Sequence, residues 1–101
     1  MTNQIDKTFE FNSWLDRVRN PVGRGAIIGR IIRAQGGNFG DTEPVGEGVS
    51  EMRVFVGPGY CIYFVRTGSN RYLLLYGSGK ADQNRGIRLA KEILHALRGK
   101  R

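Results

Sequence analysis

The chain has 101 residues, of which 40% are hydrophobic and 10% aromatic, so it has the size of one small domain with its own core. Its single cysteine, Cys61, excludes an internal disulfide and favours a reducing compartment. No apolar run reaches the about 18 residues that a transmembrane helix needs, and the first residues lack a signal-peptide pattern. We therefore expect one cytoplasmic domain over residues 1–101.

The charge balance is strongly basic. Sixteen Lys and Arg residues oppose nine Asp and Glu residues, giving a net charge of +7, and twelve of the sixteen are Arg. Arginine forks match phosphate groups and stack on bases, so this surplus favours a nucleic acid or a ribonucleoprotein as partner. The plainer alternative is a basic surface without a partner.

The N-terminal third predicts one strand and two helices. Residues Ile5–Phe11 alternate apolar and polar side chains, which predicts a strand. Asn12 or Ser13 then caps a short helix that the Asn20–Pro21 pair ends. The side chains that this helix turns inward are Trp14, Leu15 and Val18.

A second helix is predicted from Pro21 to the glycine pair Gly36–Gly37. Its apolar arc consists of four isoleucines, Ile27, Ile28, Ile31 and Ile32, and the opposite arc carries Arg30 and Arg33. A solvated face is the simple interpretation of these two arginines, and RNA contacts are the functional one.

The rest of the chain predicts a loop, three strands and a helix. The loop covers Asn38–Gly48, because it combines glycines, a proline and acidic residues. Short turns separate the strands, which implies an antiparallel meander, and the closing segment has an amphipathic helical pattern. The strands are Val49–Val56, Tyr60–Arg66 and Arg71–Tyr76, and the helix is Ala81–Arg98. We expect the N-terminal strand to join the meander in one antiparallel sheet of four strands. Two N-terminal helices and one C-terminal helix packed on this sheet make an α+β domain.

Strand alternation assigns side chains to the two faces of this sheet. If Gly57–Gly59 is a three-residue turn, Val56 pairs with Tyr60, Arg53 lies opposite Tyr63, and Phe55 lies opposite Cys61. One face is then apolar, with Met52, Val54, Val56, Ile62 and Phe64. The other face mixes charged and aromatic groups, with Glu51, Arg53, Phe55, Cys61 and Tyr63, and Lys80 lies at one end of the sheet.

Several chemistries are disfavoured by the residues present. One histidine, His95, and one cysteine give no metal-ligand spacing, and we expect no metal and no cofactor. The run Gly77–Lys80 resembles part of a phosphate loop, but it lacks the leading glycine spacing and the Ser or Thr after the lysine.

The mixed face suits RNA, because aromatic rings stack on bases and cations bind phosphates. RNA cleavage needs a base near the 2′-hydroxyl, an acid near the leaving oxygen and cations on the phosphorane. Arg53 can only stabilise charge, whereas Lys80 can stabilise charge or donate a proton. Glu51 or a tyrosine is the candidate base, and in the nuclease hypothesis Glu51 and Tyr63 position groups or exchange protons. An ion pair between Arg53 and Glu51 is the structural alternative.

Several runs resemble the RelE-like toxins known as addiction-module killer proteins, close to the HigB group. The longest are Gly40–Arg53 (GDTEPVGEGVSEMR), Gly57–Phe64 (GPGYCIYF) and Leu73–Gln83 (LLLYGSGKADQ). The Phe9, Trp14 and Leu15 region and the Ala90–Glu92 part of the last helix are also similar. The likeness covers nearly the whole chain, and the predicted order of elements is that of the RelE/ParE fold.

This resemblance implies a type II toxin that is neutralised by a co-expressed antitoxin. The antitoxin is expected to be a small helix-turn-helix protein that also binds the operator DNA. RelE-like and HigB-like toxins cut mRNA in the ribosomal A site without a metal, mainly through Lys and Arg on the sheet. By motif, Glu51 and Arg53 occupy the basic strand positions, and Lys80 and Gln83 follow the last strand. Contacts with mRNA or ribosomal RNA are expected from Arg30, Arg33, Tyr60, Arg66, Gln83, Arg85 and Arg88.

The chain departs from the family at Cys61, where members read Gly-Tyr-Arg and that arginine is thought to bind the scissile phosphate. Losing one preorganised donor costs roughly 10²–10³ in rate. Either Arg53, Arg66 or Lys80 compensates, or this copy is weak or attenuated. A ParE-like inhibitor of DNA gyrase is the main alternative, because it shares the fold, and a non-toxic RNA-binding module is another.

Overall fold

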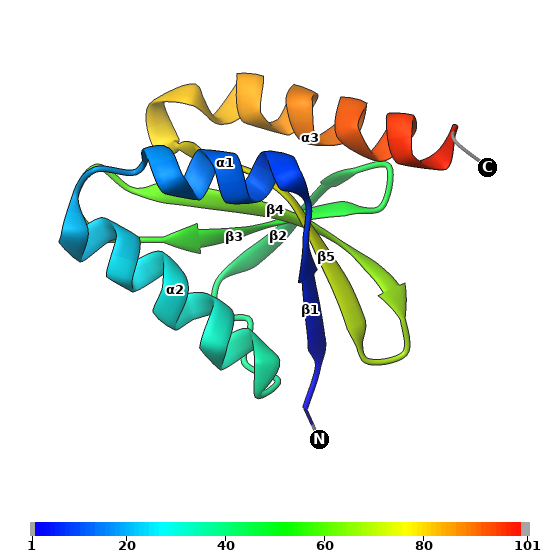
Figure 1. Cartoon of the computed structure of the whole chain (residues 1–101), viewed down its shortest axis with the longest axis horizontal. Coiled ribbons are helices and arrows are strands. Elements are labelled where there is room, and N and C mark those ends of the chain that lie inside the picture. The colour runs from blue at the N-terminus through cyan, green and yellow to red at the C-terminus, as the bar shows by residue number, and fades with distance from the viewer. Residues whose placement is uncertain (1, 100–101) are drawn as a thin grey trace.

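Residues 2–99 are described by the computed structural model, in which three helices pack on a five-stranded sheet (Figure 1). The elements in chain order are β1 (Gln4–Lys7), α1 (Phe9–Arg17), α2 (Pro21–Gln35), β2 (Thr42–Gly46), β3 (Val49–Val54), β4 (Tyr60–Gly68), β5 (Arg71–Gly79), a 3₁₀ turn (Lys80–Asp82) and α3 (Gln83–Arg98). The predicted α+β class is confirmed. No helix in the described part of the chain is long and apolar enough to span a membrane.

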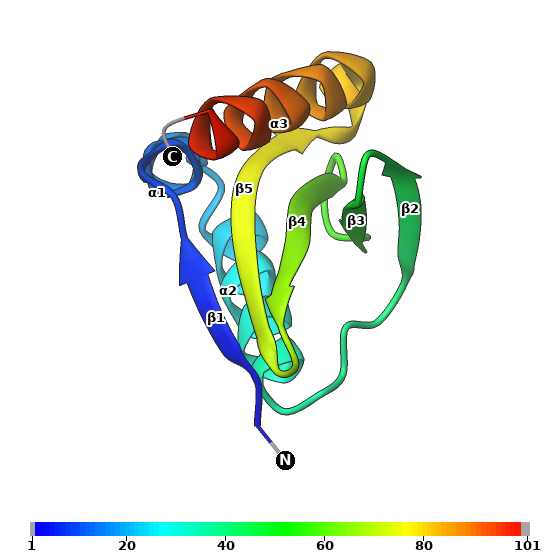
Figure 2. The same ribbon diagram turned by 90° about the vertical axis from the view of Figure 1, so that its right-hand side faces the viewer.

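The sheet is mixed, with the strand order β1-β5-β4-β3-β2 (Figure 2). The antiparallel meander of β3, β4 and β5 is confirmed. The prediction of four antiparallel strands is wrong at both edges of the sheet, at β1 and at β2. Strand β1 pairs parallel to β5, an arrangement that needs a long connection, which α1, α2 and the strands before β5 provide.

The second difference is β2, which lies inside the segment predicted as a loop. It pairs antiparallel with β3 through a two-residue turn at Glu47 and Gly48, whose φ angles are 58° and 82°. Two positive φ values are the geometry of the tight hairpin turn that matches strand twist. The glycines that suggested a loop therefore close a hairpin, and Pro44 is tolerated because β2 is an edge strand.

Helix α1 starts earlier than predicted, and its cap is Thr8 rather than Asn12 or Ser13. The Thr8 hydroxyl accepts a hydrogen bond from the Phe11 amide at 2.9 Å and donates one to the Leu75 carbonyl at 2.8 Å. The alternation of Phe9 and Phe11 resembled a strand, but Phe11 and Trp14 are buried as successive inward positions of a helix. Phe9 remains 81% exposed.

Helix α2 begins at Pro21 and ends before Gly36 as predicted, with Asn20 capping its first amides. The expected four-isoleucine face is too wide. Ile27 and Ile31 are buried, while Ile28 and Ile32 are 40% and 60% exposed. The sheet contacts a narrower stripe than the apolar arc of the sequence, and Gly23 and Ala34 complete that stripe.

Two apolar cores lie on the two faces of the sheet. Helices α1 and α2 cover the first, and α3 covers the second. The predicted division of side chains between the faces is confirmed, but the register differs, because Arg53 pairs with Cys61 and Glu51 with Tyr63. Strand β3 stops at Val54, so the connecting loop is longer than three residues. A slip of two positions leaves each side chain on its predicted face.

Helix α3 begins at Gln83, two residues later than predicted, because Lys80–Asp82 forms a 3₁₀ turn. It approaches the sheet closely at Gly86, where a Cβ would lie 2.6 Å from Ser78 Oγ. The mixed face of the sheet is therefore covered by α3 for most of its length. It opens near the start of this helix, where Lys80 and Gln83 line a pocket, and near its end, where Leu97 borders a second hollow.

Candidate functional site

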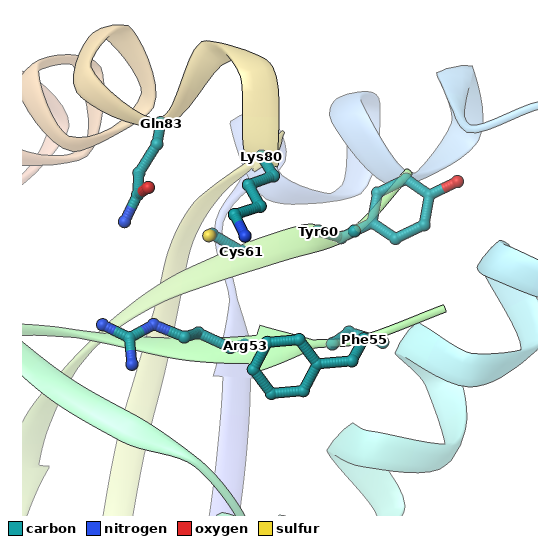
Figure 3. A pocket seen from close by; sticks show the side chains of 8 residues that line it. Arg53, Phe55, Tyr60, Cys61, Lys80 and Gln83 are labelled. Carbon is teal, nitrogen blue, oxygen red and sulfur yellow. The ribbon is translucent and has the colours of Figure 1, made fainter. Parts of the chain in front are cut away.

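A pocket of about 300 Å³ lies where β3 ends, β4 begins and the chain leaves β5 (Figure 3). Strand β3 contributes Arg53 and the adjoining Phe55, and β4 contributes Cys61. Lys80 and Gln83 reach toward them from the segment that follows β5. Five of the predicted site residues border this pocket, namely Arg53, Tyr60, Cys61, Lys80 and Gln83.

Arg53 is surrounded by carboxylates. Its Nε donates to Glu51 Oε2 at 3.0 Å, its Nη1 lies 3.5 Å from Asp41 Oδ2, and its Nη2 pairs with Glu43. The hydrogen bond with Glu43 is the largest cause of a raised Arg53 pKa, and Glu51 adds to it. The ion pair between Arg53 and Glu51 that the sequence offered as an alternative is therefore present.

Glu51 is almost fully buried, with 1% of its surface exposed. Besides Arg53, it accepts bonds from Gln83 Nε2, which lies 3.0 Å from each of its oxygens. Gln83 thus ties the start of α3 to strand β3. A carboxylate bound on both sides and shielded from water cannot reach an RNA hydroxyl in this conformation, so Glu51 positions Arg53 rather than contacting a substrate.

Tyr63 is likewise inaccessible, with no exposed surface. Its hydroxyl lies 2.7 Å from Ser78 Oγ and donates to the Gln83 carbonyl at 3.3 Å. Burial raises the Tyr63 pKa far above its ordinary value. The predicted role of Tyr63 in proton exchange is thus replaced by a structural one, because α3 covers it.

Cys61 forms the inner wall of the pocket and is 3% exposed. Burial raises the pKa of its thiol, and the charge of Glu51 raises it further. The side chain is therefore neutral and a poor nucleophile near neutral pH. Lys80 is exposed, packs its stem on Gly59, and makes no ion pair with any residue between 2 and 99.

Tyr60 was expected to contact RNA, and it borders the pocket, but its ring points away from Cys61 and Lys80 (Figure 3). It is 8% exposed and packs edge-on against Trp14, with ring centroids 6.3 Å apart. The backbone of Gly23 on α2 also lies against its ring. Strand alternation explains the difference, because neighbours Tyr60 and Cys61 must face opposite sides.

The other predicted RNA-binding arginines are distributed over the molecule. Arg85 and Arg88 share a shallow surface depression with Lys80 at the start of α3, next to the pocket. Arg66 lies at the far end of β4, where it donates to the Gly68 and Ser69 carbonyls. Arg30 and Arg33 belong to α2, on the other face of the sheet from α3. Only Arg85 and Arg88 can therefore extend the site.

The two carboxylates that the sequence reasoning missed are Asp41 and Glu43. They were assigned to a loop, although their spacing of two places them on one side of a strand. No group of metal-ligating side chains is found within residues 2–99. His95 lies instead 2.9 Å from Glu47 on the surface.

No protein-family model matches the chain. An uncharacterized protein of Haemophilus influenzae is 38% identical to it over 97 residues, which cover 96% of this chain and 98% of that protein. The chain belongs to the same family as this Haemophilus protein.

Proposed function

We propose that this protein is the toxin of a type II toxin–antitoxin module, a member of the RelE/ParE superfamily close to the HigB group. In this proposal it is a ribosome-dependent mRNA endoribonuclease that uses no metal and inhibits translation in the cytoplasm. Its partners are mRNA, the ribosome and a cognate helix-turn-helix antitoxin. The antitoxin, and not this chain, binds the operator DNA.

The observation that carries the proposal is the meeting of Arg53, Lys80 and Gln83 around one open pocket of about 300 Å³. The two cations give charge and hydrogen bonds for a phosphodiester, and Gln83 holds the Glu51 carboxylate that orients Arg53. The Phe55 ring at the rim is 66% exposed and can stack on an unpaired base. Arg85 and Arg88 extend the positive surface for neighbouring phosphates.

The chemistry follows from the substrate. The 2′-oxygen of RNA attacks the adjacent phosphorus, the bond to the 5′-oxygen breaks, and a 2′,3′-cyclic phosphate and a 5′-hydroxyl result. The 2′-hydroxyl gives its proton to solvent water, and the leaving 5′-oxygen takes one from the Lys80 ammonium. Lys80 is the accessible proton donor of the pocket, and Arg53 stabilises the phosphorane charge. Glu51 and Tyr63 act by positioning Arg53 and the start of α3.

Cys61 limits the cleavage rate in this proposal, because a neutral buried thiol occupies the position where the toxins that the chain resembles have an arginine. Lys80 is the nearest free cation among residues 2–99 that can replace its charge. Cleavage by this chain is therefore expected to be slow, and Cys61→Arg should raise its rate by about 10²–10³.

Translation of a defined mRNA on purified ribosomes, read by primer extension, tests the proposal. We expect discrete cuts within codons at the ribosomal A site, stronger with Cys61→Arg. Arg53→Ala should weaken them, whereas Arg66→Ala, which removes an arginine outside the pocket, should not. Absence of cuts from both the wild type and Cys61→Arg would refute the nuclease.

The second candidate is a ParE-like gyrase inhibitor without nuclease activity. Two observations favour it: three carboxylates already contact Arg53, and Cys61 carries no charge. It predicts inhibition of DNA supercoiling by purified gyrase, and DNA damage in cells before translation stops. The nuclease predicts the opposite order.

A further inference from the structure

The guanidinium of Arg53 binds a buried carboxylate on one side and exposed carboxylates, which another anion can replace, on the other. Its Nε is bonded to Glu51, which is 1% exposed and is also held by Gln83. This arrangement sets the orientation of the guanidinium plane. The Nη1 and Nη2 atoms are therefore left as a fork that faces away from the buried carboxylate.

Two surface carboxylates occupy this fork. Asp41 lies 3.5 Å from Nη1 and Glu43 pairs with Nη2, and their side chains are 47% and 57% exposed. The backbone keeps them in place, because Glu43 pairs with Glu51 in the sheet and the Arg53 amide donates to the Asp41 carbonyl at 2.9 Å. Asp41 directly precedes β2, the edge strand of the sheet, and Glu43 is the second residue of that strand.

Carboxylates and phosphates bind a guanidinium fork in the same way, through parallel N–H···O bonds. Exposed ion pairs of this kind are weak and exchange readily with other anions, unlike a buried pair. The Nη1 and Nη2 atoms, which a phosphodiester would bind, are thus occupied by the Asp41 and Glu43 carboxylates, which carry the same kind of charged oxygen.

We propose that Asp41 and Glu43 form an acidic latch, an internal competitor that RNA must displace from Arg53 before its phosphate can bind. This proposal rests on the function proposed above, because it takes RNA as the polyanion that enters the pocket. The latch lowers the affinity for isolated RNA, and it selects for RNA presented at high local concentration, as on a ribosome.

Removing the latch without disturbing its shape should therefore strengthen RNA binding. The variant is Asp41→Asn with Glu43→Gln, and the probe is a fluorescein-labelled single strand of ten uridines, followed by fluorescence anisotropy at fixed salt. A matched control, Asp16→Asn with Glu47→Gln, also removes two exposed carboxylates that pair with basic side chains, at sites outside the pocket. Thermal unfolding by circular dichroism checks that all variants are folded.

We expect the latch variant to bind this RNA about tenfold more tightly than the control variant does. In an Arg53→Ala background the two pairs of substitutions should have the same effect, because the latch acts only through Arg53. Equal affinities of the latch and control variants in the Arg53 background would overturn the proposal. So would a latch effect that survives Arg53→Ala, or the absence of RNA binding by every variant.

The outcome is separable from the proposed nuclease. Tighter RNA binding by the latch variant, with no ribosomal cleavage by it or by Cys61→Arg, would support the latch and refute the endoribonuclease. Ribosomal cleavage with no difference between latch and control variants would support the endoribonuclease and refute the latch.

Discussion

The contact between α3 and the sheet allows a quantitative prediction at Gly86. A Cβ at this position would lie 2.6 Å from Ser78 Oγ and 2.7 Å from Tyr63 Cε2, well inside normal contact distances. Alanine improves helix propensity by about 1 kcal/mol, but overpacking a tight interface costs about 1–3 kcal/mol. Disturbing the buried hydrogen bond between Tyr63 and Ser78 adds about 1 kcal/mol.

The expected net effect of Gly86→Ala is a loss of about 1–3 kcal/mol in the free energy of unfolding, measured by urea denaturation. For a domain of this size the melting temperature should fall by about 5–20 °C. Gly25→Ala is the matched control, because a Cβ there meets nothing within 4 Å. It should stabilise the protein by about 0.5–1 kcal/mol. Equal stabilisation by the two substitutions would refute the close seating of α3 on Tyr63.

Three other predictions concern single side chains. Thr8→Ala should lower the free energy of unfolding by about 2 kcal/mol in urea titrations, because it removes the cap of α1 and a buried hydrogen bond to β5. Thr8→Ser keeps the hydroxyl and should retain most of this stability. Similar losses for the two variants would contradict the capping role of Thr8. Because burial raises the Cys61 pKa, the native thiol keeps a proton that the unfolded chain loses above about pH 8.5. The free energy of unfolding should therefore fall as the pH rises from about 8.5 to 10. Cys61→Ser should flatten that decline. Phe55→Ala should weaken binding to a single-stranded RNA about tenfold while changing the free energy of unfolding by less than about 0.5 kcal/mol, since its ring is mostly exposed; unchanged affinity would exclude stacking.

Alternation and turn residues were enough to predict the meander and the sides of its side chains. The register of β3 on β4 was wrong by two positions, yet every side chain kept its face, because strands repeat every two residues. The alternation does not say what covers each face. The apolar arc of the last helix needed a partner surface, and Cys61, Tyr63 and Val65 provide it. This packing buries Tyr63 and removes it from the accessible site.

The environment of Arg53 could not be predicted without β2. Gly46, Gly48 and Pro44 made this segment resemble a loop, although the two glycines with Glu47 form a hairpin end. Pairing β2 with β3 is what brings Asp41 and Glu43 to the guanidinium. Lys80 was placed correctly at the end of the sheet, although β5 continues three residues beyond its predicted end at Tyr76 and stops at Gly79.

The rate of mRNA cleavage on purified ribosomes, compared between Lys80→Ala and Lys7→Ala, tests the proposed function most directly. Both substitutions remove one exposed lysine, but Lys80 lines the pocket and Lys7 lies on β1. We predict that Lys80→Ala lowers the single-turnover cleavage rate by at least about 10², while Lys7→Ala leaves it within about twofold of the wild type. Equal rates for the two variants, or no cleavage by the wild type and by Cys61→Arg, would contradict the assignment of this pocket as an endoribonuclease site.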